Sequence, residues 1–156
     1  MELTSDGVEV KWVSFTHRQS LTEHCASLNV LAAYPLSGEF TLKSGNVTCK
    51  VVALGYQTSS GKFLTILRPK IIAELADKIL PPFKGEFTTE EILQQVGLDT
   101  VAIAKTEKVY WEFPSLPFKD FITHLEYHTQ IAEGGGCFIN ITLEGYAQIT
   151  DLNTIS

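Results

Sequence analysis

The chain has 156 residues, 44 % of them hydrophobic and 19 % charged, a composition with enough apolar material for a core and no signature of intrinsic disorder. Twelve Lys and Arg against eighteen Asp and Glu give a net charge of −6, with only two arginines, Arg18 and Arg68. Nucleic acids and anionic membranes are bound by basic surfaces, so we expect neither among the partners of this protein.

The sequence carries no sign of export or of membrane insertion. Its first residues contain neither the basic region nor the apolar stretch of a secretory signal, and no apolar run approaches the roughly 20 residues of a transmembrane helix. Cys25, Cys49 and Cys137 form an odd and sparse set, which is typical of free thiols in a reducing compartment. We therefore expect a cytoplasmic protein.

The first part of the chain predicts one strand and one helix. Apolar and charged residues alternate over residues 8–13, the period of two that marks a half-buried strand. Ser20 is followed three residues later by Glu23, as in a capping box, and predicts a helix over residues 20–33 that Pro35 closes. The apolar residues that follow Ser20 recur at helical spacing, although weak helix formers interrupt them.

The middle of the chain predicts a three-stranded meander. Three runs rich in β-branched and aromatic residues cover residues 39–43, 47–56 and 62–67, and turn residues at 44–46 and 59–61 separate them. The middle run is apolar on both faces, which indicates a central strand.

Two helices follow the meander. Pro69 suits the first turn of a helix, and apolar residues at helical spacing extend the prediction over residues 69–80, where a pair of prolines stops it. Thr88 and Glu91 match a second capping box ahead of a short helix over residues 88–97, which ends at a glycine suited to a left-handed cap.

The last third predicts a strand over residues 101–113, a helix over 116–132 and a final strand over 137–149. No repeat, low-complexity tract or linker divides the chain, so residues 1–156 are predicted to form a single globular domain. Because strands come before and after the helices, the expected fold class is α+β, a mainly antiparallel sheet packed by about three to four helices.

The best candidate for chemistry is the pair His124 and His128 on the predicted helix over residues 116–132. Histidines four residues apart project from the same side of a helix and can reach one substrate, where either could act as a general acid or base near neutral pH. The residue after His124 is Leu125, whereas a zinc protease helix has a glutamate there. We expect no metal and no cofactor.

A ligand pocket is the second candidate. Trp111 and Phe121 could line an apolar cavity, with Gly135 in the triple-glycine turn and Cys137 just after it at the mouth. Each of these residues also suits an ordinary role, in the hydrophobic core or in a turn. His24 beside Cys25 suggests a nucleophile with its base, but residues adjacent in a helix point about 100° apart, which argues against that pairing.

Three functional hypotheses remain open from the sequence. The first is a non-catalytic binding or assembly module that contacts proteins, above all copies of itself, because apolar second faces at Val52, Leu54, Tyr56 and Tyr110 need a cover. The second is a small-molecule enzyme, a lyase, isomerase or hydrolase that uses His124 or His128. A coat-like subunit is a third possibility, without the basic arm that packaging of nucleic acid usually requires.

Overall fold

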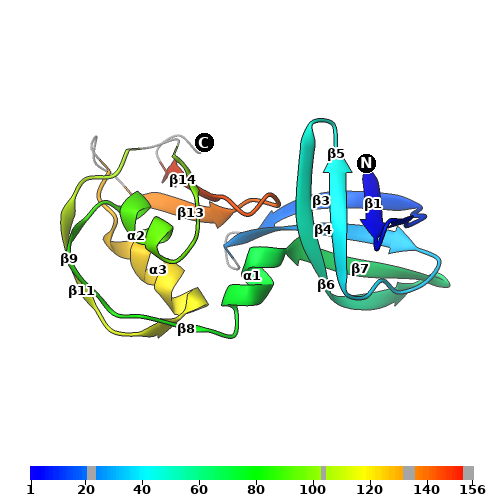
Figure 1. Ribbon diagram of the computed structural model, residues 1–156, viewed down its shortest axis with the longest axis horizontal. Coiled ribbons are helices and arrows are strands. Elements are labelled where there is room, and N and C mark those ends of the chain that lie inside the picture. Colours follow the sequence, from blue (N-terminus) through cyan, green and yellow to red (C-terminus); the bar gives the residue numbers. More distant parts are fainter. Residues whose placement is uncertain (21–23, 103–104, 132–135, 153–156) are drawn as a thin grey trace.

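The computed structural model describes residues 1–20, 24–102, 105–131 and 136–152, and it is a mostly β protein (Figure 1). Strands account for 53 % of the structure and helices for 18 %, and the described residues contain three short helices. One mixed sheet of ten strands dominates the molecule. The expected α+β class with three to four packing helices is therefore wrong, although the sheet is rich in antiparallel pairs, as predicted.

Seven strands from the first half of the chain form the right-hand part of Figure 1. They pair in the order β3-β4-β7-β6-β5-β1-β2, and every neighbouring pair is antiparallel. Their bounds are β1 Glu2–Ser5, β2 Val8–Glu9, β3 Ser14–Ser20, β4 Cys25–Ala32, β5 Glu39–Ser44, β6 Val47–Ser59 and β7 Lys62–Pro69.

The helix expected over residues 20–33 is wrong, because β3 and β4 pair there as an antiparallel hairpin. Leu28, Val30 and Ala32 are buried at every second position of β4, the period of a strand. The helical spacing read from the same stretch was coincidental. The supposed capping residue Ser20 ends β3, and Glu23 lies outside the described residues.

The three-stranded meander is confirmed. The strands β5, β6 and β7 pair in sequence order at the expected turns, and β6 lies between its two neighbours. A register shift between Ala53 and Gly55 marks a bulge in β6, beyond which the strand continues to Ser59.

The second half of the chain forms the left-hand part of Figure 1, with smaller elements around one helix. Two separate two-stranded sheets, β9 with β11 and β8 with β12, lie outside the large sheet. The elements are α1 Lys70–Leu75, β8 Ile79–Leu80, β9 Phe83–Phe87, α2 Thr89–Gln95, β10 Thr100–Ala102, β11 Val109–Phe113, β12 Leu116–Pro117, α3 Phe118–His128, β13 Cys137–Ile141 and β14 Ala147–Asp151.

Several expected elements in this half are shorter or divided. The helix predicted over residues 69–80 is only α1, because Leu80 precedes a proline and such a residue favours an extended backbone. The strand predicted over 101–113 is two strands, of which β10 joins the large sheet and β11 pairs with β9. The last strand divides into β13 and β14 around a turn at Gly145, and the helix predicted over 116–132 is α3.

The capping box at the start of α2 is confirmed. The Glu91 backbone N–H donates to Thr88 Oγ1 at 3.2 Å, and the Thr88 N–H donates to Glu91 Oε1 at 3.2 Å. These bonds satisfy backbone donors that the first turn of a helix leaves without partners. Gly97 follows the helix with φ +90°, the left-handed conformation expected of it.

The buried residues form two hydrophobic cores, and α1 contributes Ile72 and Leu75 to the second of them. One fills the first-half strands around Leu3, Val30, Val51 and Leu67, and the other surrounds α3. The large sheet connects them, because β13 pairs with the start of β4 in parallel, at Ile141 and Cys25. No helix in the described part of the chain is long and apolar enough to cross a membrane. The single domain over residues 1–156 stays a prediction.

The stabilising effect of the Thr88 cap, at the start of a helix that packs in the second core, can be tested by mutation. We expect Thr88→Ala to lower the free energy of unfolding by about 1 kcal/mol, because the side-chain acceptor of the Glu91 N–H is lost. Urea titration followed by circular dichroism measures the change. Thr58→Ala, on the exposed end of β6, is the matched control and should shift the midpoint far less; equal shifts would contradict a stabilising cap.

Candidate functional site

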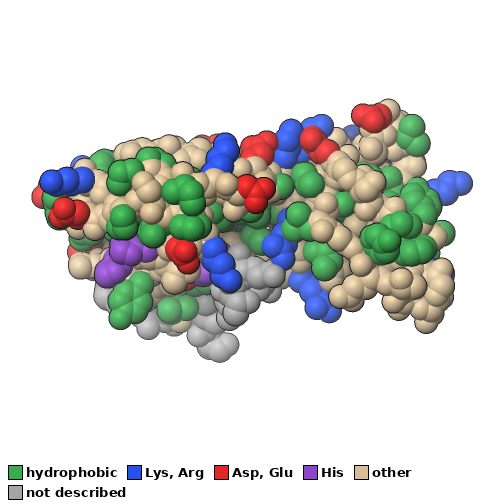
Figure 2. Space-filling model, turned by 90° about the horizontal axis from the view of Figure 1, so that it is seen from below, with side chains coloured by type: hydrophobic (Ala, Val, Ile, Leu, Met, Phe, Trp, Pro, Cys, Tyr) green, Lys and Arg blue, Asp and Glu red, His purple; other side chains and the backbone are tan. Residues whose placement is uncertain are grey.

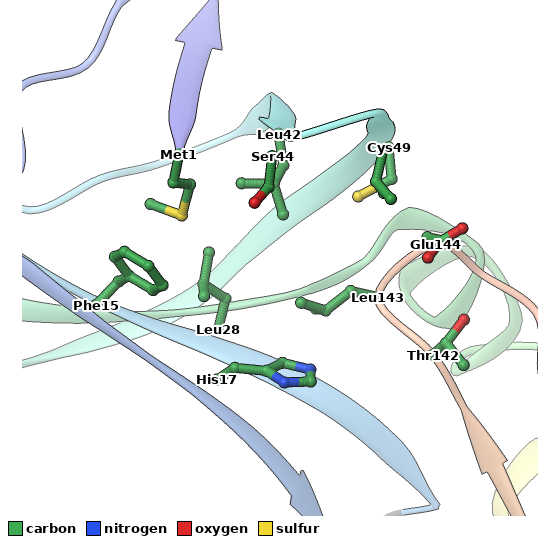
Figure 3. A pocket seen from close by; sticks show the side chains of 11 residues that line it. Met1, Phe15, His17, Leu28, Leu42, Ser44, Cys49, Thr142, Leu143 and Glu144 are labelled. Carbon is green, nitrogen blue, oxygen red and sulfur yellow. The ribbon is translucent and has the colours of Figure 1, made fainter.

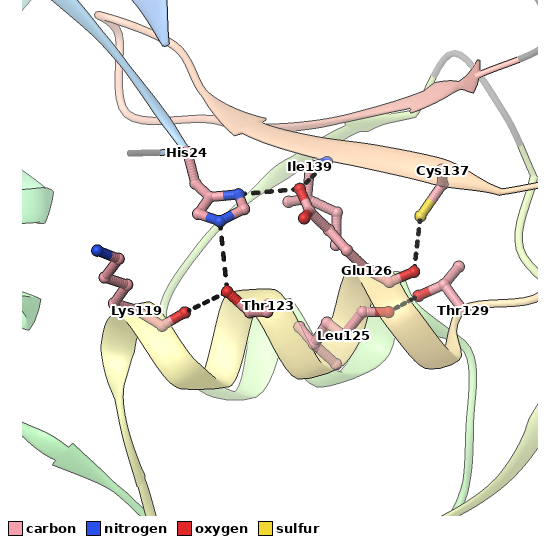
Figure 4. Close-up of polar contacts among 8 residues, drawn as sticks. All are labelled: His24, Lys119, Thr123, Leu125, Glu126, Thr129, Cys137 and Ile139. Atoms are coloured by element: carbon pink, nitrogen blue, oxygen red, sulfur yellow. Dashed lines mark hydrogen bonds and ion pairs between the residues drawn. The ribbon is translucent and has the colours of Figure 1, made fainter. Parts of the chain in front are cut away.

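A partly buried polar cluster lies between α3, β13 and the residue that precedes β4 (Figure 4). Its centre is the pair His24 and Glu126, whose Nδ1 and Oε1 atoms are 2.9 Å apart. The same carboxylate oxygen accepts the backbone N–H of Ile139 at 2.8 Å. One glutamate on α3 thus holds both the hairpin turn that begins β4 and the middle of β13.

The backbone completes this connection. His24 is buried and has φ +59°, a left-handed conformation that ends the β3–β4 turn. Its carbonyl accepts the N–H of Ile141 at 2.8 Å, directly beside the bridge between β4 and β13. Buried polar groups need partners, and here residues 24, 126, 139 and 141 supply one another.

Burial raises the pKa of Glu126 above the ordinary glutamate value of 4.5. The Ile139 N–H and the nearby His24 act in the opposite direction, because each stabilises the charged carboxylate, but they do not outweigh the loss of solvent. The carboxyl group therefore binds a proton more tightly in the folded chain than in the unfolded chain.

The predicted pair His124 and His128 lies on the outer side of α3. Their ring centroids are 4.4 Å apart, and the ring of His124 also packs on Phe113 at 4.8 Å. Burial, followed by the charge of His128, lowers the pKa of His124. Both imidazoles line a shallow surface hollow of about 340 Å³, together with Leu116, Asp120, Thr123 and Tyr127.

Of the other predicted site residues, Trp111 lies near these histidines, with its ring centroid 6.3 Å from that of His124. Phe121 is fully buried in the second core, and the Trp111 indole N–H donates to the Phe87 carbonyl at 3.0 Å. Cys137 is buried and directs its thiol at the Glu126 carbonyl, 3.9 Å away (Figure 4). Gly135 lies outside the described residues. The proposed roles of these residues in a site stay predictions.

A larger cavity, of about 430 Å³, lies in the part formed by the first-half strands (Figure 3). Phe15 and His17 of β3 face it from one side, and Met1 faces it from the start of β1. Its remaining lining is mostly apolar and comes from β4, β5, β6 and the β13–β14 turn, namely Leu28, Leu42, Ser44, Val47, Cys49, Thr142, Leu143 and Glu144.

Neither the polar cluster nor this cavity is predicted by the sequence. The sequence places His24 beside Cys25, but its partner Glu126 is 102 residues away. No spacing rule predicts such a pair, because the parallel contact between β4 and β13 creates it. An unusual glutamate on the inner side of an amphipathic helix was the one available signal.

The comparisons with known proteins give a fold relationship. No protein-family model and no curated protein sequence matches the chain. Among solved structures, the chain is similar to the prophage tail protein gp18 from Listeria monocytogenes EGD-e, with a TM-score of 0.57 and 16 % sequence identity. The similarity covers 90 % of this chain and 44 % of that protein, so the chain spans less than half of its length.

The raised pKa of Glu126 predicts a pH effect on stability. A carboxyl whose pKa is raised on folding stabilises the fold while it is protonated, and that contribution is lost as the pH rises from about 4.5. The Glu126→Gln variant has no carboxyl to ionise here, and its amide oxygen can still accept the Ile139 N–H. We therefore expect the unfolding free energy of this variant to rise relative to that of the wild type between pH 4 and pH 7. Glu112→Gln, at an exposed site on β11, is the control. If the difference in unfolding free energy between Glu126→Gln and the wild type stays constant over this pH range, the raised pKa of Glu126 is wrong.

Burial raises the pKa of the Cys137 thiol to about 11. At pH 8 only about one thiol in a thousand is then the reactive thiolate. We expect Cys137 to resist iodoacetamide in the folded protein and to react quickly in urea, as measured by mass spectrometry after digestion. Rapid labelling in the folded protein would show that the thiol is accessible and acidic.

Proposed function

We propose that this protein is a non-catalytic assembly module of a phage-tail-like structure, and that it binds other copies of itself through apolar surface. The proposal is supported by two independent features. The first is the fold that the chain shares with a protein described as a prophage tail protein. The second is a set of large apolar side chains that the folded chain leaves uncovered.

The exposed apolar side chains of β6 carry the proposal. Leu54 and Tyr56 remain 51 % and 54 % exposed, although an apolar second face on this strand needs a cover. Tyr56 packs edge-to-face on Phe63 of β7, with ring centroids 5.5 Å apart, and so is held in a defined position. No helix of the described chain covers these residues.

The surface around β6 and β7 is consistent with a contact area. Figure 2 shows several hydrophobic side chains on the part of the molecule that holds these strands. Aromatic side chains with a rigid position and a polar hydroxyl are typical of protein interfaces, where they bury much area at a low cost in entropy. A partner copy is the cover that the proposal assigns to them.

One observation favours a second candidate function. His124 and His128 line the hollow of about 340 Å³ on α3, where an imidazole could act as a general acid or base on a small molecule. No cluster of three or more His, Cys, Asp or Glu suited to a metal occurs among the described residues. Turnover lost in both His124→Ala and His128→Ala, for any hydrolase or lyase substrate, would favour this enzyme over the assembly module.

Sedimentation velocity from micromolar to about 100 µM protein tests self-association. We expect a concentration-dependent increase in mass, and we expect Tyr56→Ser to weaken it at least about tenfold, because a buried aromatic anchor is lost. Tyr127→Ser, which removes a side chain 85 % exposed on α3, is the matched control. A wild-type chain that stays monomeric throughout would refute the proposal.

A further inference from the structure

The strands β2 and β3 leave two edges of the large sheet without a strand partner in the described structure. β3 pairs along its whole length with β4 only, and β2 pairs with β1 only. An unpaired edge presents a row of backbone donors and acceptors to which another strand can add. The two edges belong to one stretch of chain, residues 8–20.

The β3 edge combines a basic side chain with a mostly apolar cavity. Phe15 and His17, two residues apart, face the cavity of about 430 Å³ (Figure 3). Arg18 is exposed, lies on the opposite face of the strand by the alternation of side chains, and makes no ion pair within the described part of the protein. β3 contains no carboxylate.

The hairpin of β1 and β2 has complementary chemistry. Val8 is 68 % exposed, more than any other large aliphatic side chain on the described strands. Glu9 next to it is also exposed. Because neighbours in a strand point to opposite faces, Val8 and Glu9 project on opposite sides of β2. Glu9 has no ion pair with any described residue, and Asp6 in the turn adds a second exposed carboxylate.

We propose that β3 of one copy binds the β2 edge of a second copy. In this arrangement Val8 enters the cavity of about 430 Å³ beside Phe15, while Glu9 forms an ion pair with Arg18 on the other face of the strands. One register allows both pairings. Side chains alternate along β3, so Phe15 and His17 lie on one face and Arg18 on the other, and in the same way Val8 and Glu9 lie on opposite faces of β2. This inference rests on the proposed self-assembly and names a surface for it distinct from Tyr56.

The contact would join unlike surfaces, so a pair of copies keeps one free β3 edge on one copy and one free β2 edge on the other. Such a head-to-tail contact continues from copy to copy and ends only when a ring closes. Charge complementarity selects this arrangement over a symmetric pairing of two β3 edges, which would place the two Arg18 side chains close together. The protein would therefore form rings or filaments rather than closed dimers.

Charge reversal tests the contact. We expect Arg18→Glu and Glu9→Lys each to weaken association at least about tenfold, because each places like charges together at the interface. An equimolar mixture of the two variants should regain wild-type association, since every contact in an alternating assembly then joins opposite charges. Val8→Asp, which would place a charge in the mostly apolar cavity beside Phe15, should also weaken association. Sedimentation velocity measures all four samples.

Lys84→Glu makes the same change of charge at an exposed position of β9 and is the matched control. Circular dichroism melts establish that the exposed substitutions leave the fold intact. If Tyr56→Ser weakens association while Arg18→Glu and Val8→Asp do not, the proposed function survives and this contact is wrong. Failure of the mixture to recover would also overturn the contact, and a monomeric wild type would overturn both proposals.

Discussion

The continuity of the large sheet depends on the point where β13 meets the start of β4, and hydrogen bonds among residues 24, 126, 139 and 141 hold that point. The strand β4 begins in contact with β13 and continues into the first core, so the sheet can pass from one core to the other only where these strands meet. Glu126 satisfies Ile139 and pairs with His24 at that point, and the His24 carbonyl accepts from Ile141. Without these partners, backbone and side-chain polar groups would be buried without hydrogen bonds, at a cost of about 1–3 kcal/mol each.

This junction explains why an ionisable side chain is retained at a partly buried position. An apolar residue in place of Glu126 would pack there without a desolvation cost, but it would leave the Ile139 N–H and the Nδ1 atom of His24 without this partner, while His24 Nε2 keeps the Thr123 hydroxyl at 3.4 Å. The raised pKa of Glu126 is the electrostatic consequence of placing a carboxylate in such a position. The cluster is therefore best understood as the connection between the two parts of the protein, and its histidine has a structural partner.

The outer surface has a different character from the junction. Many of its exposed large apolar side chains, among them Val8, Leu54 and Tyr56, are on strands, and the edges of β2 and β3 have no strand partner among the described residues. Monomeric proteins usually protect such edges, so their presence is consistent with a protein that functions in contact with others. The similarity to a prophage tail protein, at 16 % identity, establishes the fold alone.

The sequence by itself determined the local elements whose signals are short in range. The meander over β5, β6 and β7 and the capping box at Thr88 follow from turn residues and from contacts three residues apart. Only the tertiary structure decided that residues 25–32 form a strand and that His24 meets Glu126. Those outcomes depend on pairing with segments far along the chain, and the free energy of that pairing outweighs the weak helical preference of the local sequence.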